Sequence, residues 1–183
     1  MNRAAFLDRD GVINRKAPGD GYVTCWEEMH LLPGVAQAIS LLNQAQFKVI
    51  VVSNQRCVAK GLVTTAGVDA IHRRLCSELA AAGAVIDGVY YCPHEKQPPC
   101  DCRKPEPGML LSAARQHELD LAASWMIGDS AADVTAGKKA GCKTARLTGI
   151  DNGANGHADV IAPSLIEAVR QILSISLISC DKE

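Results

Sequence analysis

The sequence predicts an α/β fold in which helices cover both faces of a mainly parallel sheet. Short apolar runs alternate with longer segments whose apolar residues recur at helical spacing, and this alternation is typical of parallel sheets. Polar residues follow several of the apolar runs directly, at the edge where such sheets bind ligands. With 183 residues the chain is long enough for one well-buried domain, so we expect a single domain over residues 1–183.

The elements follow from the spacing of apolar residues and from the residues that end them. Val68, Ile71 and Leu75 mark the buried face of one helix, which Thr64 is suited to cap and Gly83 to end. Segments whose apolar residues recur at neither helical nor strand spacing predict loops, including a mobile one rich in Gly and Asn. We expect strands at 4–7, 48–52, within 85–91, and at 124–127, 143–147 and 159–162; helices at 33–45, 64–82, 106–117, 131–140 and 165–173; and loops at 14–29 and, mobile, at 151–157.

Composition narrows the classes of partner. The net charge is −1 and 21% of the residues are charged, which gives no excess of positive charge for nucleic acid or a membrane surface. No apolar run approaches the roughly 20 residues of a membrane span, and Asp8 interrupts the N-terminal segment too early for a signal-peptide core. We therefore expect a cytoplasmic protein, most simply a monomer, whose partner is a small molecule.

Four groups of polar residues carry the chemistry. Asp8 and Asp10 follow the first predicted strand, Ser53-Asn54-Gln55 follows the second, and Asp129 follows the fourth. Arg103-Lys104 precedes a predicted helix. An aspartate pair before a glycine is often only a turn, but four such groups around one sheet edge indicate a site for an anionic ligand.

In order and spacing, these groups resemble the four motifs of the haloacid dehalogenase superfamily of phosphatases, over about residues 3–149. The resemblance implies a Rossmann-like fold without a large cap domain. It is strongest to the D,D-heptose 1,7-bisphosphate phosphatase branch, whose close relatives are histidinol phosphatases. The segments that carry it are Asp8-Arg9-Asp10-Gly11, Gly21-Tyr22-Val23, Ser53-Asn54-Gln55, Tyr91-Cys92-Pro93-His94, Cys100-Asp101-Cys102-Arg103-Lys104-Pro105 and Pro107-Gly108-Met109.

The resemblance implies roles for individual residues. Asp8 is the expected nucleophile, which forms an aspartyl-phosphate, and Asp10 the expected general acid and then general base. Two acids so close should not ionise equally, and we expect Asp10 to be the one able to carry a proton. Lys104 would neutralise both the phosphate and Asp8. The remaining residues expected to bind the phosphate are Ser53, Asn54, Gln55 and Arg103.

A divalent cation is expected between the aspartates, because a phosphate dianion approaching Asp8 would otherwise be repelled. Carboxylate oxygens of Asp8 and Asp129 and the backbone carbonyl of Asp10 are hard ligands that suit Mg²⁺. Asp133 is expected to orient the metal's surroundings. The sequence thus predicts a magnesium-dependent phosphatase.

A second metal site is predicted in the loop over residues 92–102. Three thiolates and one imidazole form a closed tetrahedral set, which is typical of structural Zn²⁺ and leaves no position for substrate. Free thiols and a redox pair are the alternatives, but three prolines make this loop hard to fold without a metal. The predicted ligands are Cys92, His94, Cys100 and Cys102.

The resemblance implies removal of the C7 phosphate from D-glycero-D-manno-heptose 1,7-bisphosphate, a step of lipopolysaccharide heptose biosynthesis. Histidinol-phosphate phosphatase is the alternative within enzymes, and a catalytically inactive zinc-loop binding module the alternative of another class. One departure bears on the substrate: Arg56 and Lys60 stand where the heptose enzymes carry a small residue and an arginine. We expect His72 to be a surface or packing residue and not a ligand.

Overall fold

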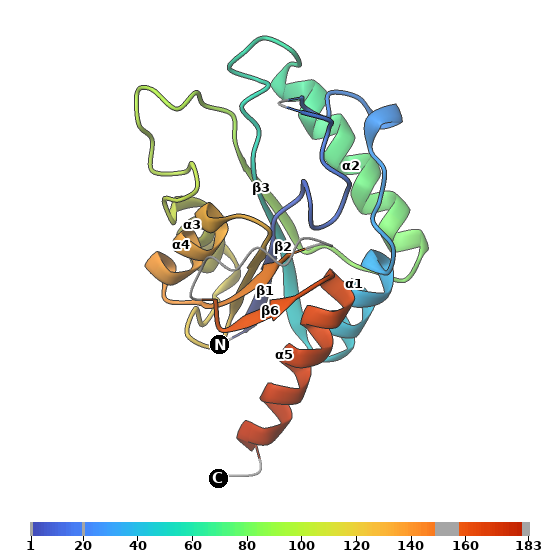
Figure 1. Ribbon diagram of the computed structural model, residues 1–183, viewed down its shortest axis with the longest axis vertical. Coiled ribbons are helices and arrows are strands. Elements are labelled where there is room, and N and C mark those ends of the chain that lie inside the picture. The colour runs from blue at the N-terminus through green and yellow to red at the C-terminus, as the bar shows by residue number, and fades with distance from the viewer. Residues whose placement is uncertain (1, 20, 149–157, 181–183) are drawn as a thin grey trace.

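The computed structural model describes residues 2–19, 21–148 and 158–180. These residues form one parallel sheet whose strand order is β3-β2-β1-β4-β5-β6 (Figure 1). The predicted α/β class is confirmed. The strands are β1 Arg3–Leu7, β2 Phe47–Asn54, β3 Gly88–Cys92, β4 Trp125–Gly128, β5 Lys143–Leu147 and β6 Val160–Ala162.

The strand order places a topological switch between β1 and β4. The chain builds outward from β1 to β3, then returns to β4 and builds outward in the other direction. β1 and β4 are therefore neighbours, with Ala5 opposite Trp125 and Leu7 opposite Ile127. Ligands of open α/β sheets bind beyond the carboxyl ends of the strands at such a point.

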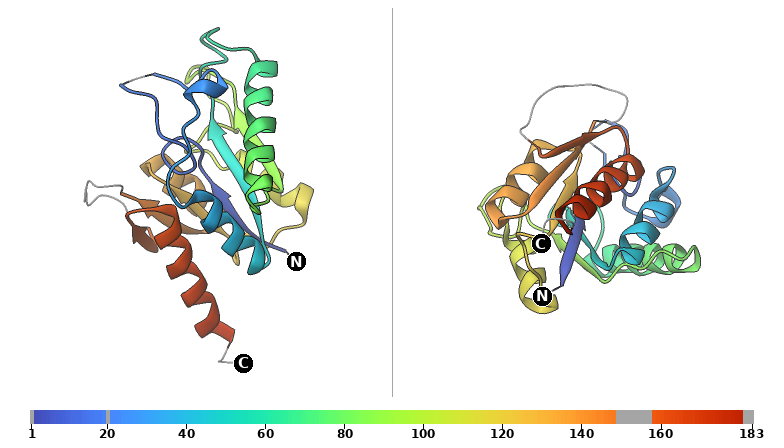
Figure 2. Two further views of the ribbon diagram at one scale, coloured as in Figure 1. Left: turned by 90° about the vertical axis from the view of Figure 1, so that its right-hand side faces the viewer. Right: turned by 90° about the horizontal axis from the view of Figure 1, so that it is seen from below.

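The helices divide between the two faces of the sheet, as Figures 1 and 2 show. Alternate residues of β1 serve the two cores, because successive side chains of a strand point to opposite faces. Ala5 and Leu7 pack under α1, α2 and α5, whereas Ala4 and Phe6 pack under α3 and α4. The helices are α1 Val35–Gln44, α2 Thr65–Ala81, α3 Gly108–His117, α4 Ala131–Ala140 and α5 Leu165–Cys180.

Some boundaries differ from the sequence-based expectation. Helix α3 begins at Gly108 and not at 106, because Pro107 precedes it and the N–H of Gly108 bonds to the carbonyl of Asp101 (2.9 Å). Helix α5 runs past 173 to Cys180, and the sequence there holds no glycine or proline to end it. A short 3₁₀ helix, Trp26–Glu28, lies inside the predicted loop 14–29. The mobile loop predicted at 151–157 lies outside the described residues.

Beyond the carboxyl edge of the sheet, the described ranges hold loops, the short 3₁₀ helix and the first turns of α2, so these ranges contain no large cap domain. No helix in the same ranges combines the length and apolar character that a bilayer crossing requires.

Candidate active site

Two tight turns bring the carboxylates after β1 and β4 together. The N–H of Asp8 continues the pairing of β1 with β4 by donating to the carbonyl of Ile127 at 3.0 Å. Gly11 then has a φ of +96°, and a Cβ there would collide with Asp129. A Cβ on Gly128 would likewise collide with Asp133. Glycine at these two positions therefore lets the carboxylates approach.

Lys104 is the buried cation of the site. Its Nζ lies 2.8 Å from Oδ1 of Asp8 and 2.6 Å from Oδ1 of Asp133. It also donates to the carbonyl of Val52 at 2.8 Å, so all three of its donors are used. Burial lowers the pKa of Lys104, but the charges of Asp8 and Asp133 outweigh this effect and raise it. Lys104 is thus a fixed positive charge against Asp8.

The pKa values of Asp8 and Asp10 are shifted in opposite directions. Burial raises the pKa of Asp8 to about 7, against the lowering effect of the Lys104 charge. The pKa of Asp10 is lowered, because the charge of Arg9 and hydrogen bonds from Asn14, Arg9 and Gln55 outweigh its burial. The expectation that Asp10 carries a proton during the reaction stays a prediction. The residue between the two aspartates, Arg9, decides the difference.

The second group of polar residues positions the other parts of the site. The side chain of Asn54 exchanges two hydrogen bonds with the backbone of Lys104, each 3.0 Å long. Nε2 of Gln55 donates to Asp10 at 3.1 Å and to the hydroxyl of Ser53 at 2.7 Å. The Ser53 hydroxyl can therefore direct its own proton toward the cavity.

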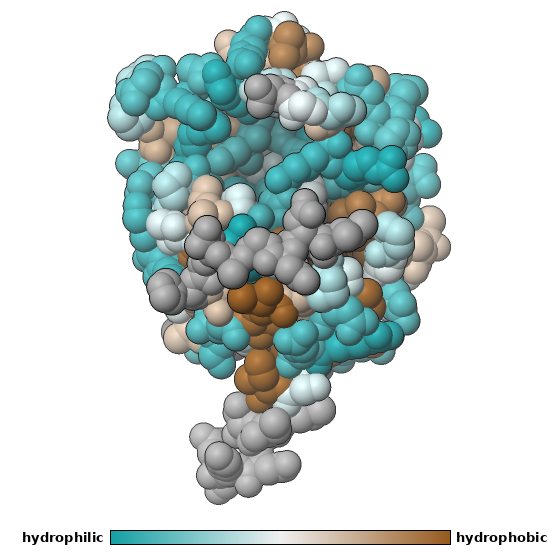
Figure 3. All heavy atoms as spheres, in the orientation of Figure 1, coloured by the Kyte–Doolittle hydropathy of each residue, from teal (hydrophilic) through white to brown (hydrophobic). Residues whose placement is uncertain are grey.

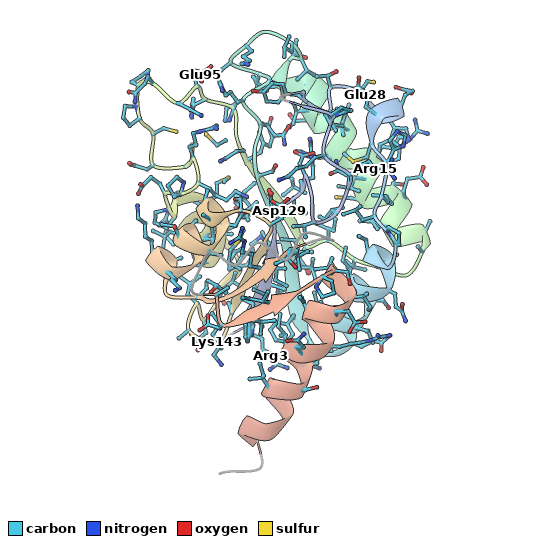
Figure 4. All side chains as sticks on the ribbon, viewed as in Figure 1. Arg3, Arg15, Glu28, Glu95, Asp129 and Lys143 are labelled. Carbon is cyan, nitrogen blue, oxygen red and sulfur yellow. The ribbon has the colours of Figure 1, made fainter. Side chains whose placement is uncertain are left out.

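These groups surround a cavity of about 150 Å³ at the carboxyl edge of the sheet. Figure 4 shows Asp129 near the middle of the molecule, and Figure 3 shows hydrophilic side chains around the hollow above it. Gln55 and Arg103 do not line this cavity, so their direct contact with phosphate stays a prediction. The cavity is lined by Asp8, Asp10, Lys16, Ser53, Asn54, Lys104, Asp129, Ser130, Ala132 and Asp133.

Lys16 and Ser130 are the polar lining residues that sequence reasoning missed. Nζ of Lys16 lies 2.6 Å from Oδ2 of Asp129, and its side chain is 56% exposed. Its position in a long loop after the first strand is the only sequence signal for it. Ser130 caps α4 and bonds to Asp133 at 2.5 Å, so a capping pattern marked it but not a role in the site.

Three carboxylates could hold a cation here. Oxygens of Asp8, Asp129 and Asp133 lie within 4.8 Å of one another. Oδ1 of Asp129 is buried and has no hydrogen-bond partner among the described residues, as expected of a metal ligand. The donors are all hard oxygens, so the residues fit Mg²⁺. The carboxylate of Asp10 does not belong to this set and faces Arg9.

The predicted zinc ligands come together at the base of the loop over residues 93–101. Sγ of Cys92 lies 3.6 Å from Sγ of Cys100 and 3.6 Å from Nδ1 of His94, which lies 3.2 Å from Sγ of Cys102. Zinc bonds of 2.0–2.3 Å give tetrahedral edges of roughly 3.5–3.8 Å. The four residues therefore fit a tetrahedral metal. Arg103 donates to the carbonyl of His94 at 3.4 Å and so contacts this loop.

The two residues that depart from the heptose enzymes, Arg56 and Lys60, each contact a residue of another loop. Arg56 forms an ion pair with Glu95, which Figure 4 places on the loop over residues 93–101. Nζ of Lys60 lies 5.0 Å from the centre of the Tyr22 ring, at cation–π distance. These contacts join the loops that follow β1, β2 and β3.

The fold and this site define a Rossmann-like α/β hydrolase in which an aspartate pair and a buried lysine face a small polar cavity. A family model described as HAD-hydrolase-like matches residues 101–169. The relatives described next cover most of the chain at high identity. The chain belongs to the haloacid dehalogenase-like family of hydrolases, and the resemblance drawn from the four motifs is confirmed.

Two curated relatives and one solved structure illustrate the similarity. The D-glycero-beta-D-manno-heptose-1,7-bisphosphate 7-phosphatase of Rhodopseudomonas palustris is 44% identical over 81% of this chain and 84% of its own length. The D-glycero-alpha-D-manno-heptose-1,7-bisphosphate 7-phosphatase of Mycobacterium bovis is 40% identical over 88% of this chain and 87% of its own length. The D,D-heptose 1,7-bisphosphate phosphatase of B. bronchiseptica, crystallised with magnesium and phosphate, has a TM-score of 0.85 and 35% identity, covering 96% and 99% of the two chains.

Proposed function

We propose that this protein is a magnesium-dependent phosphatase that removes the C7 phosphate of D-glycero-D-manno-heptose 1,7-bisphosphate. The observation that carries the proposal is the placement of Asp8, Asp10 and Lys104 around one small cavity. The names of the relatives supply the substrate, since the curated relatives above act on this bisphosphate. Their names include both anomers, and the proposal therefore names none.

In the first step, a carboxylate oxygen of Asp8 attacks the phosphorus of the ester. The bond from phosphorus to the C7 oxygen breaks, and an aspartyl-phosphate forms. Lys104 stabilises the negative charge on the transferring group and keeps Asp8 oriented through their 2.8 Å contact. The Ser53 hydroxyl donates to a phosphate oxygen.

Asp10 moves the proton in both steps. The arriving phosphate adds negative charge beside Asp10, which raises its pKa and favours the protonated carboxyl. That proton passes to the departing C7 oxygen, so the sugar leaves as an alcohol. Asp10 then accepts a proton from the water that attacks phosphorus, the aspartyl-phosphate bond breaks, and inorganic phosphate leaves.

Asp8, Asp129 and Asp133, with the backbone carbonyl of Asp10, would hold Mg²⁺. When bound, the ion would neutralise charge at the phosphate and favour the ionised form of Asp8. The magnesium in the B. bronchiseptica structure supports this part of the proposal. Lys16, which forms an ion pair with Asp129, adds positive charge on the outer side of the cavity.

Cys92, His94, Cys100 and Cys102 would hold Zn²⁺ in a structural role. The cluster ends two residues before Lys104 in the sequence, so a metal there fixes the approach of the chain to the site. Its four protein ligands leave no position for substrate. The support is that the four ligand atoms all lie within 4.8 Å of one another.

We further propose that the chain acts as a monomeric single domain. We also propose that it acts in the cytoplasm, because its substrate, a sugar bisphosphate, is too highly charged to cross a membrane unaided. Light scattering of the purified protein tests the monomer. A mass twice that of the chain would contradict it.

A panel of substrates tests the proposed function. We expect phosphate release from the heptose bisphosphate to exceed release from histidinol phosphate and simple hexose phosphates by at least about 100-fold in kcat/KM, since the bisphosphate differs from these substrates in charge as well as shape. Omitting Mg²⁺ should abolish all activities. A ratio near one, or a preference for histidinol phosphate, would refute the heptose assignment and leave the phosphatase assignment standing.

A further inference from the structure

Arg9 is a fully buried arginine between the two aspartates of the first motif. Its Nη2 donates to both oxygens of Asp10 at 3.0 Å, and its Nε reaches Oδ1 at 3.3 Å. A guanidinium that forks onto a carboxylate in this way fixes the plane of the carboxyl group. Asp10 is therefore held in one orientation from its buried side.

The other terminal nitrogen of Arg9 points away from Asp10 to a histidine. Nη1 of Arg9 lies 3.2 Å from Nε2 of His72, which α2 contributes. Arginine can only donate, so Nε2 must be the nitrogen that carries a lone pair, and the ring is neutral with its proton on Nδ1. His72 thus acts as an acceptor that fills the third side of the Arg9 fork.

The His72 ring is held in place by packing, since its surroundings do not satisfy both ring nitrogens. It is 4% exposed, and its ring lies 5.4 Å from the ring of Tyr91, whose hydroxyl bonds to Asp69 at 2.8 Å. Its Nδ1 is buried without a hydrogen-bond partner among the described residues. An unpaired buried donor costs stability, and an apolar side chain would avoid that cost. Such a replacement would lose the lone pair on Nε2, which accepts the hydrogen bond from Arg9.

From this geometry we infer that His72 is a positioning residue of catalysis: it accepts a hydrogen bond from Arg9 and so holds the Arg9 fork, and through it Asp10, in the orientation that proton transfer requires. The inference rests on the proposed function, in which Asp10 is the general acid and base. This role goes beyond the expectation that His72 is a surface or packing residue. The residue acts through Arg9 and does not contact the substrate cavity.

Two substitutions of similar size separate the hydrogen bond from the packing. His72→Gln places an amide oxygen near the position of Nε2 and keeps an acceptor for Arg9, whereas His72→Met fills the space without one. We expect His72→Met to lower kcat about 10-fold or more with KM nearly unchanged, since small misplacements of a catalytic group have effects of this size. His72→Gln should retain kcat within about 3-fold of the wild type.

The assay is phosphate release from the heptose bisphosphate, or from the best substrate of the panel, at saturating Mg²⁺, with Asp10→Asn run in parallel. Equal kcat in His72→Met and wild type would overturn the inference, as would equal losses in the two His72 variants or a loss confined to KM. If His72→Met does not fold, reduced kcat in His72→Gln would overturn it. Normal turnover by Asp10→Asn would instead refute the proposed role of Asp10.

Discussion

Nζ of Lys104 lies 2.8 Å from Oδ1 of Asp8, although 96 residues separate the two in the sequence. The contact depends on Asn54, whose side chain bonds to both the N–H and the carbonyl of Lys104. Residues from three of the four motifs are thus joined in one buried arrangement. The charge at Asp8 is therefore set by residues that only the folded sheet brings together.

Replacing Lys104 with methionine should lower kcat by about 10²–10³-fold, the usual effect of removing one fixed donor to a developing negative charge. Lys104→Arg should not restore activity, because the side chain is only 3% exposed and a guanidinium does not fit beside both Asp8 and Asp133. Phosphate release measures the effect, and circular dichroism confirms the fold. Turnover near wild type in Lys104→Met would show that this charge is dispensable.

Lys16→Ala should raise KM several-fold with a smaller effect on kcat, because Lys16 stands on the outer, exposed side of the cavity. Steady-state kinetics at low and high salt measure the effect, and higher salt should narrow the difference from wild type. Lys139→Ala is the matched control, since Lys139 pairs with Glu106 and does not line the cavity. Equal KM values in the two variants would remove Lys16 from substrate binding.

The purified protein should contain one tightly held zinc per chain, together with magnesium that exchanges freely. Cys100→Ser removes one of the four ligands, so we expect lower zinc content and a lower Tm. Cys25→Ser changes a cysteine outside the cluster and should retain both. Elemental analysis and thermal unfolding decide the matter. Unchanged metal content in Cys100→Ser would exclude the zinc site.

The stability of the folded protein should decrease as pH falls, and His72 should account for part of the decrease. Burial and the charge of Arg9 lower the pKa of His72 from 6.5 to about 4, against the opposite effects of Asp10 and Asp69. Between these values the unfolded chain binds a proton that the folded chain does not, so stability decreases as pH falls from 6.5 toward 4. The full effect is on the order of 3 kcal/mol.

Urea unfolding of wild type and His72→Gln at several pH values from 4 to 7 isolates this contribution. Carboxylates also titrate in this pH range, but they do so in both proteins. The difference in unfolding free energy between the two should therefore change with pH in the direction that favours the variant at low pH. A constant difference would mean that His72 titrates normally in the folded protein.

The sequence was sufficient for the strand and helix pattern and for most of the residues around the cavity. Asp8, Ser53, Lys104 and Asp129 were predictable because each stands directly beside an element whose period is clear. His72 was not predictable as the hydrogen-bond acceptor for Arg9, because the two residues are 63 positions apart in the sequence.

Side-chain direction accounts for the remaining differences. Gln55 belongs to a recognisable motif but turns to Asp10 and Ser53 and not to the cavity. Lys16 belongs to no motif, and only the path of its loop brings it to Asp129. Spacing along a chain indicates which edge of a sheet a residue reaches. Which neighbour a long side chain then contacts is decided by tertiary packing.

Trapping the covalent intermediate tests the central claim, that Asp8 is the nucleophile. The enzyme is mixed with the heptose bisphosphate and Mg²⁺, quenched in acid within the first turnover, digested and examined by mass spectrometry. We expect one phosphoryl group on the peptide that contains Asp8, and neither phosphoryl group nor turnover in Asp8→Asn. A phosphoryl group on another residue, or normal turnover by Asp8→Asn, would contradict the account.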